Sequence, residues 1–165
     1  MEADDYSIKI RIPSLVDVFY LPVLFFRAIQ EDYQFYDSSV RNRIKKKNSL
    51  RRLLVAKLRK RRLVLVAYSH GRRVGILLGS SNPSGVGMVN WLYTLPEFRK
   101  KKIGRRLLEK AENDFLNRGC HKITLTTEVA PEFYRRIGYT EEGILRKHWW
   151  GKDFYIFSKA LKDLK

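Results

Sequence analysis

The chain has 165 residues, of which 44% are hydrophobic and 13% aromatic, which suits one compact domain (1–165) and excludes a disordered or fibrous protein. Its 34 Lys and Arg outnumber 17 Asp and Glu, and the net charge of +17 predicts an anionic partner. A single cysteine, Cys120, excludes an intramolecular disulfide; with three scattered histidines it also argues against a metal site and favours a reducing, cytoplasmic setting.

The N-terminal region predicts a strand followed by an apolar helix. Residues 7–12 alternate as a short strand, and Ser14 with Asp17 forms a capping-box pattern at the start of a helix that runs to about Gln30. Pro22 is expected to kink this helix or to mark its first turn. The apolar stretch is shorter than the ~20 residues of a membrane span, and the acidic N-terminus is unlike a signal peptide, so no membrane partner is expected.

The next region predicts a basic helix. It begins near Asp37 or Ser38, and a helical stripe of apolar residues continues to Leu58. No acidic residue lies between Asp37 and Glu97, a gap that holds fourteen Lys or Arg, twelve of them in residues 41–62. This segment therefore carries the excess positive field, which attracts RNA, ribosomes, anionic membranes or a phosphorylated cofactor, although a solvated basic helix is the default interpretation.

The remainder alternates strands and helices. The expected strands are a meander of three followed by one strand and a closing hairpin: 63–68, 73–78, 86–94, 121–127, 139–149 and 154–161. A helix is expected over 103–118 and a short one over 131–137, and each can serve as a crossover. We therefore predict an α/β protein (an α+β mixed sheet) of about seven strands with helices on both faces.

The strongest chemical signal is a basic loop between a strand and a helix. A helix start offers free backbone N–H groups and the positive end of a dipole, and Gly104 leaves room for a bulky anion to approach them. Formal charge comes from six neighbouring residues: Arg99, Lys100, Lys101, Lys102, Arg105 and Arg106. Together these features predict a site for a diphosphate.

This segment resembles the cofactor motif of the GNAT N-acetyltransferases, R/Q-x-x-G-x-G/A, with Arg99 in the first place and Gly104 in the last. Lys102 departs from the motif because it stands where the family usually has a glycine. The segment from Ala130 to Tyr139 is similar to the family's A-x-x-F-Y-x-x-x-G-F/Y element, and the meander and closing hairpin follow in the same order. The resemblance covers roughly residues 7–162 and implies the GNAT (acyl-CoA N-acyltransferase) fold.

The resemblance implies that acetyl-CoA is the co-substrate. Its pantetheine arm would pair with the backbone of Leu92, Tyr93 and Thr94, and Thr127 stands where many members use an asparagine for that arm. Its diphosphate would lie over the helix start, formed by Arg99, Lys100, Lys101, Lys102, Ile103, Gly104 and Arg105. No metal is implied.

The resemblance also implies a direct attack of an amine on the thioester. Tyr134 matches the family's tyrosine beside the sulfur and would act as the general acid, while a backbone N–H of the 86–94 strand would polarise the carbonyl. Glu128 is the first candidate for the base, with Glu31, Asp32 and Tyr93 as alternatives. His148, Trp149 and Trp150 lie where such folds border the acceptor site, although aromatic packing explains them more simply. Cys120 is interpreted as structural.

Three hypotheses follow for the function. The chain is an N-acetyltransferase acting on a protein N-terminus, a lysine or a small amine; or a non-catalytic GNAT-like module that binds RNA or the ribosome through residues 41–62; or an acetyltransferase that docks to RNA through that segment. Steep salt dependence of binding would indicate phosphate contacts. The acceptor and the oligomeric state stay open.

Overall fold

The computed structural model describes residues 8–47, 49–58 and 62–161. Its strands are β1 (Ile8–Arg11), β2 (Arg62–Ser69), β3 (Arg72–Ser81), β4 (Val86–Thr94), β5 (Lys122–Thr127), β6 (Thr140–Leu145) and β7 (Phe154–Ala160). Its α-helices are α1 (Leu15–Asp32), α2 (Ser38–Lys47), α3 (Leu50–Leu58), α4 (Ile103–Asn117) and α5 (Pro131–Arg136). Two 3₁₀ turns, η2 (Pro96–Phe98) and η3 (Trp149–Gly151), complete the described elements.

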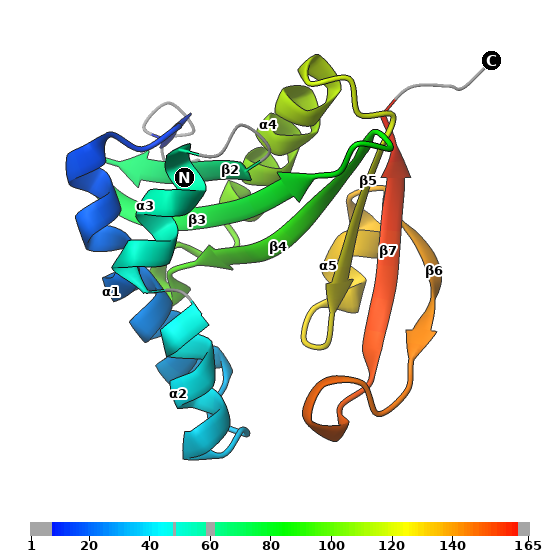
Figure 1. Cartoon of the computed structure of the whole chain (residues 1–165), viewed down its shortest axis with the longest axis horizontal. Helices are drawn as coiled ribbons and strands as arrows, with labels where there is room; N and C mark the ends of the chain where they lie inside the picture. Colours follow the sequence, from blue (N-terminus) through cyan, green and yellow to red (C-terminus); the bar gives the residue numbers. More distant parts are fainter. Residues whose placement is uncertain (1–7, 48, 59–61, 162–165) are drawn as a thin grey trace.

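The strands form one seven-stranded sheet in the order β1-β2-β3-β4-β5-β7-β6 (Figure 1). The β4–β5 pair is parallel and the other described pairs are antiparallel. Helix α4 connects β4 to β5, and α5 leads from β5 to β6, so both expected crossovers are present. The predicted mixed sheet is confirmed.

Helices cover both faces of the sheet. Helices α1 and α3 pack in front of β2 and β3, while α4 packs behind the same strands (Figure 1). Strand β2 is accordingly buried from Leu63 to Ser69, because each of its faces meets a helix. The core includes Phe25 of α1, Phe115 of α4 and Phe157 of β7.

Helix α1 begins where the capping-box pattern predicts. The Ser14 hydroxyl accepts a hydrogen bond from the Asp17 N–H, and the Asp17 carboxylate accepts one from the Ser14 N–H. The buried Asp17 carboxylate also pairs with Arg73 of β3 at 2.6 Å, which ties the start of α1 to the sheet. Pro22 lies inside a continuous helix, so the expectation that it marks the first turn was wrong.

Two boundaries differ from the prediction. The single basic helix is two helices, because Ile44 and Leu50 are six residues apart, which breaks the helical stripe, and Ser49 favours a helix start. The first strand of the closing hairpin ends at Leu145 rather than at residue 149. There the Asp153 carboxylate accepts a hydrogen bond from the Lys147 N–H and draws the chain into a turn.

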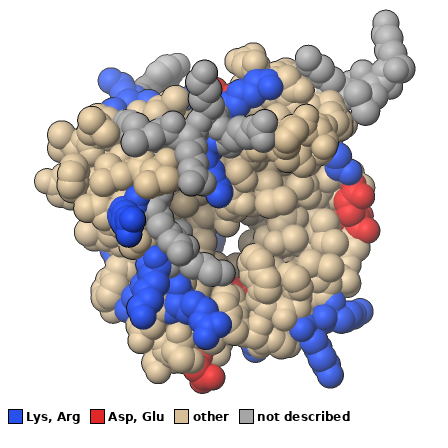
Figure 2. Space-filling view, in the orientation of Figure 1, with Lys and Arg blue, Asp and Glu red and all other residues tan. Residues whose placement is uncertain are grey.

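The basic segment 41–62 spans α2, α3 and the first residue of β2, and its residues 48 and 59–61 lie outside the described residues. Exposed cations on it include Arg43, Lys46 and Arg51, and Lys and Arg side chains gather over α2 and α3 (Figure 2). RNA or ribosome binding through this surface stays a prediction. Across the described ranges, no helix is long and apolar enough to cross a membrane.

Candidate functional site

A cleft opens in the sheet where β4 and β5 separate. The two strands pair only between Val86 and Val89 on β4 and between Lys122 and Leu125 on β5. A β-bulge on β4 leaves Asn90 without a partner on β3, and such a bulge bends and twists its strand. The strands then diverge around a cleft of about 1170 Å³, a size that suits a large ligand. The space-filling view shows the opening between the two halves of the molecule (Figure 2).

Strand β4 turns some of its side chains toward α1 and part of its backbone toward the gap between β4 and β5. The side chains of Trp91 and Tyr93 face α1: the Trp91 ring lies 5.3 Å from Phe25, and the Tyr93 hydroxyl donates a hydrogen bond to Glu31 at 2.5 Å. The N–H of Leu95 donates to β3, so strand alternation turns the backbone groups of Leu92 and Thr94 toward the gap. Free backbone groups along this edge can pair with an extended ligand.

The start of α4 lies in the same cleft and lacks a cap. Lys102 is the N-cap residue but its side chain makes no capping hydrogen bond, and Arg106 is the residue whose N–H donates back to Lys102. The N–H groups of Ile103, Gly104 and Arg105 therefore have no helical acceptor. Amides in this position, at the positive end of a helix, are suited to an anion.

Lys102 adopts a left-handed conformation with φ 58°. A side chain in this region costs roughly 1–2 kcal/mol, which is the physical reason that glycine suits the position. Lys100 is also left-handed, with φ 62°. Both lysines line the cleft, and neither makes an ion pair within the described part of the chain, so their ammonium groups are available to an anion.

Gly104 is not required by packing of the protein itself. A Cβ placed there would lie 3.4 Å from the ring of Phe133 and 3.9 Å from the hydroxyl of Thr94, which are ordinary contacts. A larger side chain would extend over the free amides of α4. The arrangement therefore fits a diphosphate group, because the space above these amides stays open only while this residue is small.

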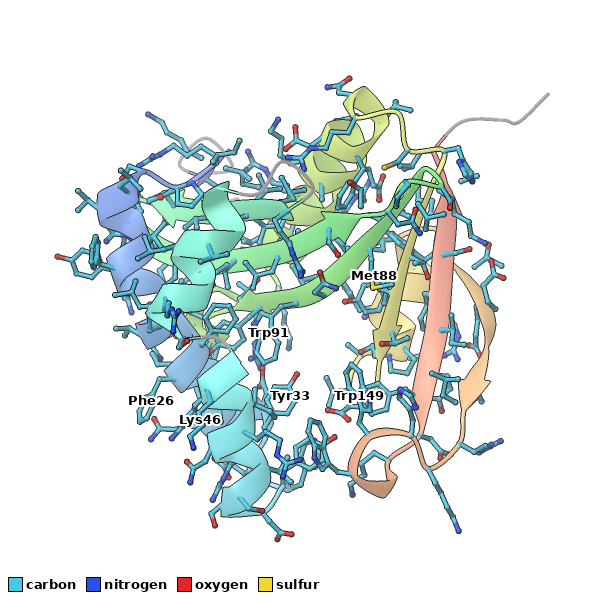
Figure 3. All side chains as sticks on the ribbon, viewed as in Figure 1. Phe26, Tyr33, Lys46, Met88, Trp91 and Trp149 are labelled. Atoms are coloured by element: carbon cyan, nitrogen blue, oxygen red, sulfur yellow. The ribbon has the colours of Figure 1, made fainter. Side chains whose placement is uncertain are left out.

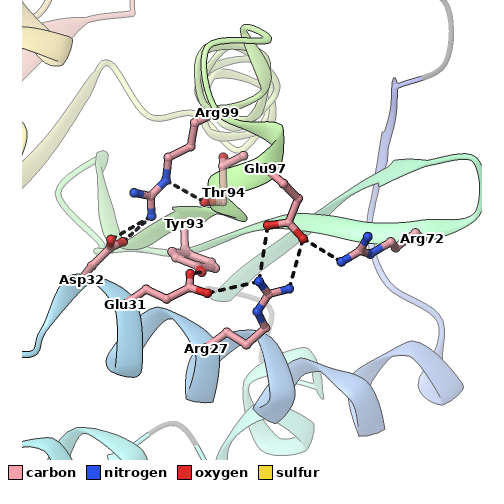
Figure 4. Close-up of polar contacts among 8 residues, drawn as sticks. All are labelled: Arg27, Glu31, Asp32, Arg72, Tyr93, Thr94, Glu97 and Arg99. Carbon is pink, nitrogen blue, oxygen red and sulfur yellow. Dashed lines mark hydrogen bonds and ion pairs between the residues drawn. The ribbon is translucent and has the colours of Figure 1, made fainter.

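Arg99 is held by a network of polar contacts rather than projecting freely (Figure 4). Its guanidinium lies 2.7 Å from Asp32 at the end of α1 and donates to the carbonyl of Thr94 at 3.1 Å. Glu31 accepts from Tyr93 and pairs with Arg27 at 3.1 Å. This network fixes the end of α1 against the end of β4 and gives Asp32 and Glu31, the alternative bases, cationic partners.

The predicted cofactor-binding residues lie together with one exception. Those that line the cleft are Leu92, Tyr93, Thr94, Arg99, Lys100, Lys102, Ile103, Gly104, Arg105, Thr127 and Tyr134. Lys101 is not part of the lining, and its ammonium lies over the ring of Phe98, 5.2 Å from the centroid. Arg105 is additionally paired with Glu109 at 2.8 Å.

Tyr134, the predicted general acid, lines the cleft from α5. Its ring packs against Phe133, Tyr139 and Phe157 at centroid distances of 5.1, 5.8 and 5.6 Å. Burial raises the pKa of its hydroxyl, and within the described residues this hydroxyl makes no hydrogen bond. The phenol therefore stays protonated at neutral pH and is available to a ligand.

Glu128, the predicted base, also lines the cleft and directly follows β5. The hydroxyl of Tyr36, from the loop between α1 and α2, donates a hydrogen bond to it. Desolvation raises the pKa of Glu128, while this hydrogen bond and the nearby Lys152 lower it in part. Of the described carboxylates that line the cleft, Glu31 and Asp32 are bonded to arginines, whereas Glu128 has a neutral partner. A proton-accepting role suits a carboxylate with a raised pKa.

Aromatic side chains that the sequence patterns did not single out lie near Trp91 and Glu128. The ring of Tyr33 stacks on Trp91 at 5.5 Å and on Tyr36 at 5.9 Å. Trp149 and Trp150 line the cleft as the resemblance implied, whereas His148 does not and instead stacks on Trp149. The signal for Tyr33 and Tyr36 was present as an aromatic-rich turn between two helices.

Other chemistry is not evident at this site. Across residues 8–47, 49–58 and 62–161, no three His, Cys, Asp or Glu side chains lie close enough together to hold a metal ion. Cys120 is buried outside the lining of the cleft, and burial raises the pKa of its thiol. Its position agrees with a structural role.

Comparisons with known proteins agree with this geometry. The acetyltransferase (GNAT) domain family matches residues 60–141. An uncharacterized N-acetyltransferase of Methanocaldococcus jannaschii is 35% identical over 106 residues, which cover 61% of this chain and 67% of that protein.

Solved structures share the fold over nearly the full chain. The PaiA N-acetyltransferase from Thermoplasma acidophilum, crystallised with coenzyme A, superposes with a TM-score of 0.80 at 24% identity, covering 93% of this chain and 99% of that one. The ribosomal-protein-S18-alanine N-acetyltransferase from Escherichia coli superposes with a TM-score of 0.72 at 15% identity, covering 96% of each chain.

Proposed function

Because this chain belongs to the GNAT superfamily of acetyl-CoA-dependent N-acetyltransferases, we propose that it acetylates a primary amine by direct attack, with Glu128 as the base and Tyr134 as the acid. The acceptor is a protein N-terminus, a lysine side chain or a small amine. The observation that carries the proposal is the divergence of β4 from β5. It places the uncapped start of α4, the Tyr134 phenol and the Glu128 carboxylate in one cleft.

The coenzyme is held by main-chain groups and cations. The free amides of Ile103, Gly104 and Arg105, with the ammonium groups of Lys100 and Lys102, hold the diphosphate. The backbone of Leu92 and Thr94 holds the extended pantetheine arm, with the Thr127 hydroxyl nearby. When bound there, acetyl-CoA supplies an activated acetyl group.

Glu128 and Tyr134 move the protons. Glu128 takes a proton from the acceptor ammonium, and the neutral nitrogen then forms a bond to the acetyl carbon while the carbon–sulfur bond breaks. Glu128 passes its proton to solvent, and the nitrogen releases its second proton there as well. Tyr134 donates a proton to the departing sulfur and regains one from solvent. Each turnover thus converts one ammonium ion and one thioester into an amide, a thiol and a proton.

Titration with acetyl-CoA tests the coenzyme site. Wild-type protein is expected to show saturable binding by calorimetry, and mass spectrometry of an amine mixture is expected to show acetylated product. Lys102→Glu should raise the Kd at least about tenfold, because it replaces a cation in the lining with an anion.

Lys101→Glu is the matched control. It changes the net charge by the same amount one residue away, but Lys101 lies outside the lining, so its effect should stay below about threefold. Equal losses in the two variants would indicate a general charge effect, and an absence of saturable acetyl-CoA binding by the wild type would refute the proposed function.

A further inference from the structure

The acceptor side of the cleft is walled by aromatic rings from distant parts of the chain. Tyr33 and Trp91 lie on one side of this region and Trp149 lies on the other, with Met88 of β4 above them in the view of Figure 3. The Tyr33 and Trp91 rings are stacked with an interplanar angle of 21°. Stacked aromatic faces bind hydrocarbon chains and cations, so this wall suits a ligand that has both.

Two loops meet across the outer end of this wall. The ring of Tyr36, before α2, contacts the edge of Trp150, before β7, at a centroid distance of 5.2 Å. The hydroxyl of Tyr36 also donates to Glu128, which follows β5. We call the Tyr36–Trp150 contact the aromatic bridge. It links the α1–α2 loop to the β6–β7 loop. Trp150 lines the cleft together with Glu128, while the buried Tyr36 supports both of them from outside the lining.

The charge at this end favours a cation. Glu128 is the cleft carboxylate without a cationic hydrogen-bond partner among the described residues, and it accepts its hydrogen bond from the Tyr36 hydroxyl. Lys152 lowers the pKa of Glu128 in part, but it is not among the lining residues, and its ammonium lies 5.5 Å from the ring of Phe35. An ammonium ion next to Glu128 would be paired with a carboxylate and flanked by ring faces.

We propose that the aromatic bridge selects acceptors whose amine is carried by an unbranched CH₂ group, such as a lysine side chain or a linear alkylamine. The proposal rests on the proposed function and chooses among its acceptors. A slender methylene chain fits between the rings of Tyr33, Trp91 and Trp149, with the amine at Glu128. The α-amine of any N-terminal residue other than glycine sits on a branched carbon, which the bridge excludes sterically.

Two isomeric amines test the selection. 1-Aminopentane and 3-aminopentane have the same atoms and charge, but the second carries its amine on a branched carbon. We expect kcat/KM of the wild type to favour 1-aminopentane at least about tenfold, a typical discrimination for a shape difference of this size. A lysine amide blocked at its α-amine should likewise be preferred over an alanine amide.

Removal of the bridge should remove the preference. Trp150→Gly opens the bridge without backbone strain, because φ of residue 150 is 52°, a conformation that glycine adopts freely. The ratio of kcat/KM for the two pentylamines should fall at least about fivefold in this variant. Phe19→Ala, which removes an exposed aromatic ring on the outer face of α1, should leave the ratio unchanged.

The outcomes separate this inference from the proposed function. Saturable acetyl-CoA binding with equal use of both pentylamines, or acetylation of the α-amine alone, would overturn the selection and leave the acetyltransferase intact. An unchanged ratio in Trp150→Gly would overturn the role of the bridge. If the wild type binds no acetyl-CoA, both the inference and the proposed function are wrong.

Discussion

The two walls of the cleft, one for the coenzyme and one for the acceptor, are formed by different kinds of chemical group. The wall proposed to hold the coenzyme, here called the coenzyme wall, consists of main-chain groups and cations from one stretch of the chain, from Leu92 to Arg105. The acceptor wall consists of side chains from four separate segments, represented by Tyr33, Trp91, Glu128 and Trp150. Helix and strand geometry fixes the first, whereas the second depends on which side chains the loops present.

Because of this difference, substitutions on the two walls should change different properties of the enzyme. A change on the coenzyme wall should alter affinity for a ligand that is the same in every turnover. A change on the acceptor wall should alter proton transfer or the choice of amine and leave coenzyme affinity unchanged. The same scaffold can therefore acquire another acceptor through loop substitutions without losing its coenzyme site.

The largest expected effect lies between the two walls, at Tyr134. Tyr134→Phe keeps the ring that packs on Phe133, Tyr139 and Phe157 but removes the proton donor. We expect kcat to fall about 100-fold or more, with the Kd for acetyl-CoA within about threefold of the wild type. Stopped-flow or steady-state thiol release measures kcat, and calorimetry measures Kd; unchanged turnover would remove Tyr134 from the mechanism.

Glu128 should show a smaller effect that is confined to the acceptor wall. Glu128→Gln keeps the size of the side chain and a partner for Tyr36 but removes the proton acceptor. We expect kcat to fall about 30- to 100-fold at neutral pH, and the loss should shrink as pH rises toward the pKa of the amine, where the acceptor is already neutral. A loss that is equal at all pH values would argue against a role as the base.

The coenzyme wall is tested at Gly104 by two substitutions of different size. A Cβ at this position meets Phe133 at an ordinary distance, so Gly104→Ala should bind acetyl-CoA within about threefold of the wild type and gain up to about 1 kcal/mol of stability from helix propensity. Gly104→Val should raise the Kd about tenfold, because its methyl groups project over the free amides. Calorimetry and thermal melts measure both, and a Gly104→Val variant with normal affinity would place the diphosphate elsewhere.

The two walls also differed in how far they could be predicted from the sequence. The position of the residues of the coenzyme wall in one cleft was predictable, because Arg99 to Gly104 are adjacent in the chain and form a loop and a helix start directly after β4. The ion pair between Arg99 and Asp32 could not be predicted from the sequence, since it depends on where α1 ends. The turn of Lys101 toward Phe98 was equally invisible.

On the acceptor wall, Glu128 and Trp150 were expected from the sequence, whereas the places of Tyr33 and Tyr36 escaped prediction for a topological reason. Tyr36 and Glu128 are 92 residues apart and meet because β4 diverges from β5 and the α1–α2 loop reaches across the gap. Local patterns carry no signal for such a contact.

The break between α2 and α3 was missed because the prediction placed the six-residue gap between Ile44 and Leu50 within one helical stripe. The early end of β6 was missed because the contact of the Asp153 carboxylate with the Lys147 N–H sets it.

The smallest expected effect sharpens the comparison at Tyr36. Tyr36→Phe keeps the ring of the aromatic bridge but removes the hydrogen bond that lowers the pKa of Glu128, so that pKa should rise further above its usual value. Glu128 acts as a base when ionised, and activity is lost as pH falls through its pKa. The acidic limb of the kcat profile should therefore move to higher pH, with less than about a tenfold loss on that limb, the most that one hydrogen bond supplies.

Because the ring remains, the ratio of kcat/KM for the two pentylamines should be unchanged in Tyr36→Phe. A shift of the acidic limb to lower pH would contradict the assignment of Glu128 as the base. A changed ratio would show that the hydroxyl rather than the ring selects the amine.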